Sequence, residues 1–226
     1  MKIQLDFTES TEDKLYKNIL SSNDTKGFSD RLKNFNCTRC ELYSGCKQKV
    51  LYRGNPNADI MLIGEAPGLE EDRLGIPFVG PAGKLTNKIF ESIGLDTEKD
   101  MYISNVVKCR PTAKPGTGRQ NNTPNKEDHR DKCKPYVMRE IELVDPKVII
   151  ACGLTAAKSV FNFMEKTMMK HVSGKFFNNY TIDELKNREL FIIYHPAALL
   201  RNQELKRTMW KHIKILRTKL KELNLL

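Results

Sequence analysis

The chain has 226 residues, 39% of them hydrophobic, which is enough for one folded domain with a buried core. The sequence opens without a secretory signal and contains no run of about 18 apolar residues, so we expect a soluble protein of the cytoplasm or nucleoid, neither secreted nor bound to a membrane. Lys and Arg outnumber Asp and Glu by 38 to 28, and the net charge of +10 favours a polyanionic partner, most simply nucleic acid.

Helical patterns open the chain, and strands and helices then alternate. Residues 1–36 are polar with two short helical patterns, which predict an N-terminal helical arm. Four apolar runs predict buried strands. They span residues 59–64, 101–107, 147–153 and 190–196. Helical patterns at 81–93, 126–143 and 155–163 lie between them, so we expect an α/β fold whose parallel sheet has helices on both faces.

The last part of the chain is basic. Before it, residues 114–122 are rich in Pro, Gly and Asn and predict a loop. Residues 202–225 keep apolar side chains at helical spacing, with Lys and Arg mainly off that stripe, which predicts a basic amphipathic helix. We therefore expect an N-terminal arm over 1–36, a central domain over 37–205 and a C-terminal helix over 206–226 packed on that domain.

Polar side chains stand at the ends of three predicted strands. Glu65 follows the first strand, Asn105 ends the second and His195 closes the last. In open parallel sheets, ligands bind beyond the carboxyl ends of the strands. We expect these three side chains to converge at one edge of the sheet.

Four of the six cysteines follow the pattern C-x2-C-x68-C-x23-C. These four are Cys37, Cys40, Cys109 and Cys133. Disulfides explain them poorly in a reducing compartment. Four thiolates suit either a zinc ion or an iron–sulfur cluster, and the spacing leaves both open, together with free thiols. Cys46 and Cys152 are surplus, and Cys152 lies in an apolar run where a small buried residue is expected.

Five motifs in order along the chain resemble those of one enzyme family. They are GEAPGLEED at 64–72, GIPFVGPAG at 75–83, YISNVVKCRP at 102–111, IELVDPKVII at 141–150 and HPAALLRN at 195–202. Over about residues 36–205 the chain resembles the uracil-DNA glycosylase superfamily, and most closely its iron–sulfur branch, often called family 4. The resemblance implies a three-layer sandwich with a central four-stranded parallel sheet, and a [4Fe–4S] cluster held by Cys37, Cys40, Cys109 and Cys133.

The resemblance also implies roles in catalysis. Such an enzyme extrudes the base from the DNA stack, and negative charge grows on the base as it leaves. His195 would donate a hydrogen bond to uracil O2. The amide of Asn105 would pair with uracil O4 and N3–H, a pairing that mismatches cytosine. Glu65 would position or polarise the attacking water.

Further residues would line the base or contact DNA. Phe78 is implied as the stacking platform, Ala66 and Pro67 as backbone contacts to uracil, and Glu71 as a pocket-side carboxylate. The segment Leu199–Arg201 resembles a loop that wedges into the duplex. The DNA-binding residues are then Gly80, Gly83 and Lys84 at a helix N-terminus near the DNA backbone, with Leu200 as the wedge and Arg201 on a phosphate.

The sequence therefore predicts a monofunctional uracil-DNA glycosylase of base excision repair. It would act as a monomer on single- or double-stranded DNA containing uracil, hydrolyse the N-glycosidic bond and leave an abasic site. Asn121 aligns with the nucleophilic His of a related branch that traps uracil covalently, and since Asn is no such nucleophile, we expect turnover. Two alternatives stay open: a catalytically silent member that acts as a DNA-binding or replication accessory protein, and a zinc-stabilised nucleic-acid-binding module.

Overall fold

The computed structural model describes residues 11–112, 126–161, 163, 166–178 and 186–226, so the predicted loop at 114–122, with Asn121, lies outside the described residues. The helices are α1 (Thr11–Leu20), α2 (Thr25–Asn34), α3 (Leu69–Leu74), α4 (Pro81–Glu91), α5 (Glu127–Val144), α6 (Leu154–Val160), α7 (Met169–Val172), α8 (Pro196–Arg201) and α9 (Leu205–Glu222), with a 3-10 helix at Glu41–Ser44. The strands are β1 (Tyr52–Gly54), β2 (Ile60–Gly64), β3 (Met101–Asn105), β4 (Val148–Cys152), β5 (Phe176–Phe177) and β6 (Glu189–Ile193).

One mixed sheet forms the centre of the molecule, with the strand order β1-β3-β2-β4-β6-β5. The four predicted strands are its central, parallel part. The predicted number of four is wrong for the sheet as a whole, because β1 and β5 pair antiparallel with β3 and β6 at the two edges. These edge strands have three and two residues, too few for a periodic pattern to appear in the sequence.

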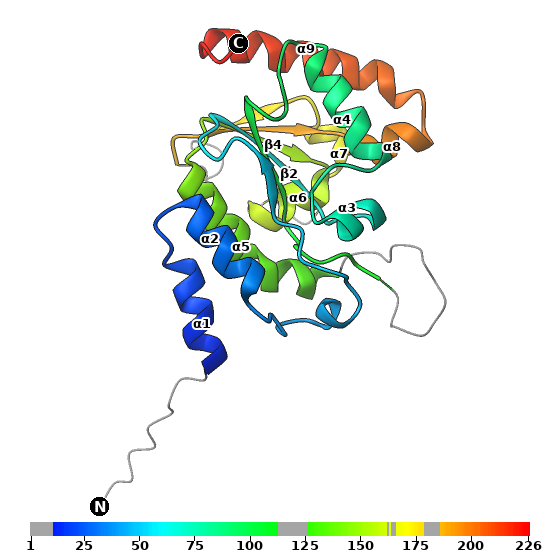
Figure 1. Cartoon of the computed structure of the whole chain (residues 1–226). Helices are drawn as coiled ribbons and strands as arrows, with labels where there is room; N and C mark the ends of the chain where they lie inside the picture. The colour runs from blue at the N-terminus through cyan, green and yellow to red at the C-terminus, as the bar shows by residue number, and fades with distance from the viewer. Residues whose placement is uncertain (1–10, 113–125, 162, 164–165, 179–185) are drawn as a thin grey trace, which may run out of the picture.

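Two hydrophobic cores lie on opposite faces of the sheet, because successive side chains of a strand point to opposite sides. In β2, Ile60 and Leu62 enter one core while Met61 and Ile63 enter the other. Helices α4, α8 and α9 cover the first core, and α1, α2, α5 and α6 cover the second (Figure 1). This arrangement confirms the predicted three-layer α/β sandwich.

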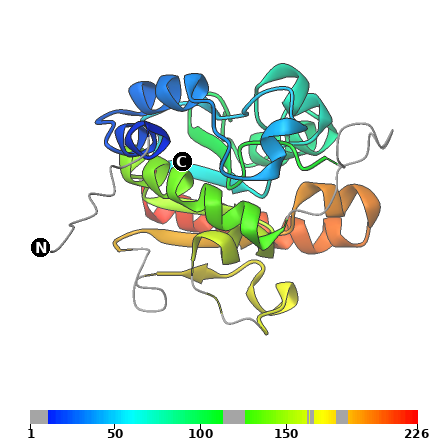
Figure 2. The ribbon, with the colours of Figure 1, turned by 90° about the horizontal axis from the view of Figure 1, so that it is seen from below.

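The two ends of the chain pack on opposite faces. Helices α1 and α2 lie beside α5 (Figure 2), and Asp24 caps α2 by accepting a hydrogen bond from the Gly27 amide at 2.7 Å. Helix α9 buries Met209, Ile213 and Leu216 against the sheet, and each such side chain contributes about 1.5–3 kcal/mol. In the described part of the chain, every helix is too short or too polar to span a lipid bilayer.

The carboxyl ends of the parallel strands all lie at one end of the molecule. Helix α3 follows β2, α6 follows β4 and α8 follows β6. Helices α4 and α8 pack against each other beside this edge (Figure 1). The strand ends and these helix starts together form the walls of the site described next.

Candidate active site

A pocket of about 160 Å³ opens at the carboxyl ends of the strands. Its lining residues are Ala66, Gly68, Glu71, Phe78, Ala82, Gly83, Asn105, His195 and Ala197. The predicted convergence of strand ends therefore holds for Asn105 and His195. Among the described residues, Glu65 and Pro67 do not line this pocket.

Asn105 forms one wall, and a glycine makes room for its amide. Asn105 is buried at the end of β3, where it pairs in parallel register with Gly64 of β2. A Cβ atom at Gly64 would lie 2.2 Å from Asn105 Oδ1 and 2.6 Å from Phe78 Cζ. Since carbon atoms cannot approach so closely, only glycine at position 64 lets the amide and the aromatic ring meet in one pocket.

A buried ion pair between Lys108 and Glu140 supports the backbone of Asn105. Lys108 Nζ lies 2.6 Å from Glu140 Oε2 of α5 and donates to Ser104 Oγ and to the Asn105 carbonyl oxygen, each at 2.8 Å. The side chains of Lys108 and Glu140 are 2% and 1% exposed. Burial raises the pKa of Glu140, while Lys108 opposes that rise. The ammonium thus fixes the peptide that carries the pocket amide.

Phe78 forms another wall of the pocket and lies in a strained turn. Its φ of 56° is unusual for a bulky residue and costs about 1–3 kcal/mol. The carboxylate of Glu71 accepts hydrogen bonds from the amides of Val79 at 3.0 Å and Gly80 at 2.7 Å, which holds the turn after Phe78. A Cβ atom at Gly83 would lie 1.9 Å from the Phe78 carbonyl oxygen, so this position also requires glycine.

His195 is the N-cap of α8, and Pro196 occupies the first turn of that helix. Its Nδ1 accepts a hydrogen bond from the Ala197 amide at 3.2 Å, so the neutral ring carries its proton on Nε2. Burial lowers the pKa of His195 to about 4, and nearby Arg201 adds to this effect. The ring centre lies 6.3 Å from that of Phe78. The imidazole is therefore an uncharged hydrogen-bond donor at neutral pH.

Glu65 lies beside the pocket and faces α6. Its carboxyl group forms a hydrogen bond with Thr155 near the start of that helix. Burial raises the pKa of Glu65, and Thr155 and the positive charge of Arg130 oppose the rise. The predicted water-positioning carboxylate is thus half-buried and bonded to Thr155 beside the pocket, whereas Asn105 and His195 line the pocket.

The predicted DNA contacts lie along α4 and α8. Lys84, Leu200 and Arg201 are exposed. The Gly80 amide is occupied by Glu71, and Gly83 lies under the Phe78 turn. The expected wedge loop is wrong in conformation, because the His195 cap and Pro196 start helix α8 there and Leu199 is buried in the core. Leu200 remains the exposed apolar side chain of this segment, and all five DNA contacts stay predictions.

The four thiols of the cysteine pattern come from separate segments that meet beside α5. Cys37 and Cys40 precede the 3-10 helix, Cys109 follows β3, and Cys133 lies in α5. Burial raises the pKa values of Cys40 and Cys133, and the Cys40 charge adds to the rise at Cys133. Cys109 has a hydrogen bond with Cys46 and also feels the charges of Cys133 and Cys40, so each of the four thiols lies within electrostatic reach of at least two others.

The donor set of four cysteine thiols fits the ligands of an iron–sulfur cluster as well as those of a zinc ion. Among the described residues, no group of three or more His, Cys, Asp or Glu side chains is arranged to hold a metal ion. Four thiols without a histidine match the usual ligands of such a cluster.

The sequence motifs do not indicate the charged residues that support the pocket. The motifs assign Lys108 and Glu140 no role as supports of the pocket, although Glu140 lies between Val137 and Ile141 on the apolar face of a helix. A charged residue at such a position is a signal for a buried partner. Arg53, described below, carries no comparable signal, because its strand is too short to show a pattern.

The comparisons with known proteins agree with this geometry. The family model of the uracil DNA glycosylase superfamily matches residues 51–216, and the chain therefore belongs to that superfamily. Among curated relatives, a type-4 uracil-DNA glycosylase of Archaeoglobus fulgidus is 39% identical, with 75% of this chain and 81% of the relative aligned.

Two further relatives place the chain within one branch. The type-4 uracil-DNA glycosylase of Sulfurisphaera tokodaii is 37% identical over 80% of this chain and 79% of its own length. That of Saccharolobus solfataricus is 41% identical over 76% of each chain. The protein is thus a member of the type-4 uracil-DNA glycosylases.

Proposed function

We propose that the protein hydrolyses the N-glycosidic bond of uracil in DNA, at the pocket formed by Asn105, His195 and Phe78. The observation that carries this proposal is that a buried amide, a neutral imidazole donor and an aromatic ring line one pocket of about 160 Å³. Such a pocket suits one planar base taken out of the stack.

Asn105 accounts for the choice of base. Its NH2 group donates to uracil O4 and its Oδ1 accepts from uracil N3–H. Cytosine has an amine at C4 and no hydrogen on N3, so donor would face donor and acceptor would face acceptor. Lys108 donates to the Asn105 carbonyl oxygen and so holds the backbone from which this amide projects.

His195 accounts for the departure of the base. The C1′–N1 bond breaks with its electron pair moving onto the uracil ring, and water adds to C1′ and releases a proton, which gives free uracil and an abasic site. Negative charge grows on O2, where the Nε2–H of His195 donates a hydrogen bond. A single donor of this kind contributes about 100- to 1000-fold in rate. Glu65 keeps its proposed role of positioning the water from beside the pocket.

The reaction is proposed to end at the abasic site. A lyase step needs an amine that attacks the sugar, and Lys108 is the lysine bonded to the Asn105 peptide. Its ammonium is buried and paired with Glu140, so it is not available as a nucleophile.

The thiols are proposed to hold a [4Fe–4S] cluster through Cys37, Cys40, Cys109 and Cys133. Bound there, the cluster would supply four iron–thiolate bonds that join the segment before the 3-10 helix, the end of β3 and α5. Iron and acid-labile sulfide analysis of anaerobically purified protein is the test. About four of each per chain is expected, and zinc without iron would refute the assignment.

Incubation of the protein with oligonucleotides that carry one uracil, single- or double-stranded, tests the proposed activity. Alkali then cleaves the abasic sites. Product is expected with a uracil strand and none with a matched cytosine strand. No product at stoichiometric protein would leave the silent DNA-binding member as the better description. Gel filtration with light scattering checks the predicted monomer.

A further inference from the structure

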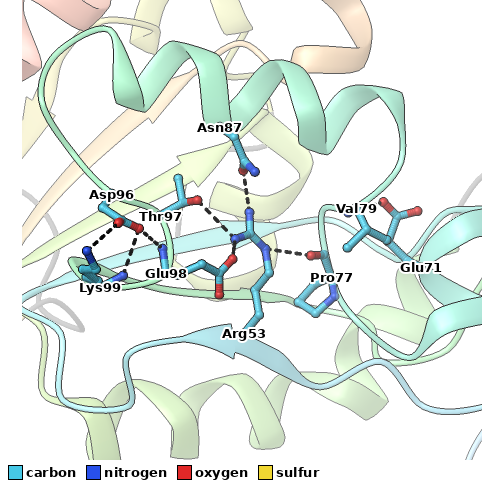
Figure 3. A network of polar contacts seen from close by, with 9 residues as sticks. All are labelled: Arg53, Glu71, Pro77, Val79, Asn87, Asp96, Thr97, Glu98 and Lys99. Atoms are coloured by element: carbon cyan, nitrogen blue, oxygen red, sulfur yellow. Dashed lines mark hydrogen bonds and ion pairs between the residues drawn. The ribbon is translucent and has the colours of Figure 1, made fainter.

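Arg53 of β1 has a buried guanidinium that contacts three separate segments (Figure 3). Its side chain is 7% exposed. Nε donates to the Pro77 carbonyl oxygen at 3.0 Å, and Nη2 donates to Asn87 Oδ1 of α4 at 2.6 Å. Nη1 donates to Thr97 Oγ1 at 3.2 Å and to the carboxylate of Glu98. Four of the five guanidinium hydrogens thus have acceptors.

The turn that presents Glu98 is itself closed by hydrogen bonds. The Asp96 carboxylate accepts from the Glu98 amide at 2.9 Å and lies 3.4 Å from Lys99 Nζ (Figure 3). The acceptors around Arg53 therefore come from an ordered turn, a helix and the buried residue Pro77 of the loop before Phe78. A planar fork of fixed geometry can satisfy them together, which a lysine ammonium cannot.

The contact with Pro77 lies directly before Phe78. On the other side of Phe78, Glu71 holds the amides of Val79 and Gly80. The Arg53 guanidinium thus binds the peptide oxygen before Phe78, whose φ is 56°, and the Glu71 carboxylate binds the two amides after it. Both charged groups bind backbone atoms. They therefore fix the strained conformation of Phe78 without contacting its aromatic ring.

We propose that Arg53 is a positioning residue for base binding, which holds the Pro77 carbonyl and thereby sets the Phe78 ring against the extruded base. This inference rests on the proposed function of the pocket. The proposal gives a role to a buried charged residue of an edge strand that lies outside the five motifs of the family resemblance. If Arg53 served only to join β1 to α4, the hydrogen bond to Asn87 would be enough and the one to Pro77 would not be needed.

A double-mutant cycle separates the two roles, because effects through a shared partner are not additive. Single-turnover excision of uracil from duplex DNA is measured for the wild type, Arg53→Met, Phe78→Ala and the double variant. Loss of one aromatic–base stack is expected to slow Phe78→Ala about 5- to 150-fold. Arg53→Met is expected to slow excision about tenfold in the wild type and less than about twofold in the Phe78→Ala background.

Arg188→Met is the matched control. Arg188 is also mostly buried and pairs at 2.5 Å with an exposed carboxylate, that of Asp145, but it precedes β6 at the opposite end of the sheet. The single-turnover excision rate of Arg188→Met is expected to stay within about twofold of the wild-type rate. Where Arg53→Met does not fold, Arg53→Lys replaces it in the same cycle.

The outcomes are distinct. Equal slowing by the Arg53 variant in both backgrounds, or an unchanged rate in an active wild type, would overturn the positioning role. An inactive wild type would instead contradict the proposed function. Affinity for undamaged duplex DNA, measured by fluorescence anisotropy, is expected to be unchanged, because the Arg53 side chain is buried.

Discussion

The two walls of the pocket are supported by different kinds of ion pair. Under Asn105, Lys108 and Glu140 are both sequestered inside the fold, between β3 and α5. Beside Phe78, Arg53 is buried but its carboxylate partner Glu98 is 61% exposed. Salt screens a buried pair much less than it screens a pair whose carboxylate is exposed. The ion pair beside Asn105 is therefore shielded from salt on both sides, whereas the pair beside Phe78 is open to solvent at its carboxylate.

The largest expected effect is on stability, at the Asn105 wall. Lys108→Met leaves the Glu140 carboxylate buried without its partner, which is expected to lower the free energy of unfolding by about 3–5 kcal/mol. Urea unfolding at pH 7 measures it. The double variant Lys108→Met/Glu140→Met removes both charges and should recover much of the loss. If it recovers nothing, the pair does not support this wall electrostatically.

The next effect is catalytic. Asn105→Ala and His195→Ala are each expected to lower single-turnover excision about 100- to 1000-fold, since each removes a donor that faces the base. Anisotropy with uracil-containing DNA should show nearly unchanged binding. An equal loss of binding and rate would mean that these side chains are structural.

A pH-dependent effect is expected at His195. Its folded pKa of about 4 lies below the ordinary value of 6.5, so the unfolded chain binds the proton first as the pH falls. The stability contribution is complete above about pH 6.5 and is lost as the pH falls toward 4, by at most about 3 kcal/mol. Urea unfolding of the wild type and His195→Gln between pH 7 and 4 measures it. Parallel curves would contradict the assigned pKa.

The smallest effect is expected at the exposed partner of the Phe78 wall. Glu98→Gln should change stability by less than about 1 kcal/mol, because Arg53 keeps its three other acceptors and exposed ion pairs contribute little. Thermal unfolding at low and high salt measures it. A loss as large as that of Lys108→Met would remove the contrast between the two walls.

The sequence predicted the parts of the site that belong to strand ends and motifs. The four parallel strands, and the meeting of Asn105 with His195, followed from apolar runs that end in polar residues. The family resemblance added Phe78 and Glu71 to the same pocket, and both line it.

The supports could not be predicted, because they depend on partners far apart in the chain. Arg53 meets Pro77 and Asn87 only after β1 joins the sheet edge, and neither spacing nor periodicity indicates that pairing. The conformation of the Leu199–Arg201 segment was missed for a local reason, since the capping by His195 is visible only in the folded chain. Strand-end patterns thus indicated Asn105 and His195, the family resemblance indicated Phe78 and Glu71, and tertiary contacts decided how all four are held.

The stretch from Asn105 to Cys109 joins three functions within five residues. Asn105 faces the pocket, Lys108 reaches back to the Asn105 carbonyl and across to Glu140, and Cys109 belongs to the proposed cluster set. A one-residue insertion between Asn105 and Lys108 would turn the ammonium away from its partners, however conservative the added side chain. We therefore expect this short segment to be intolerant of length changes, and a transplant of the pocket into another scaffold would have to include the whole segment.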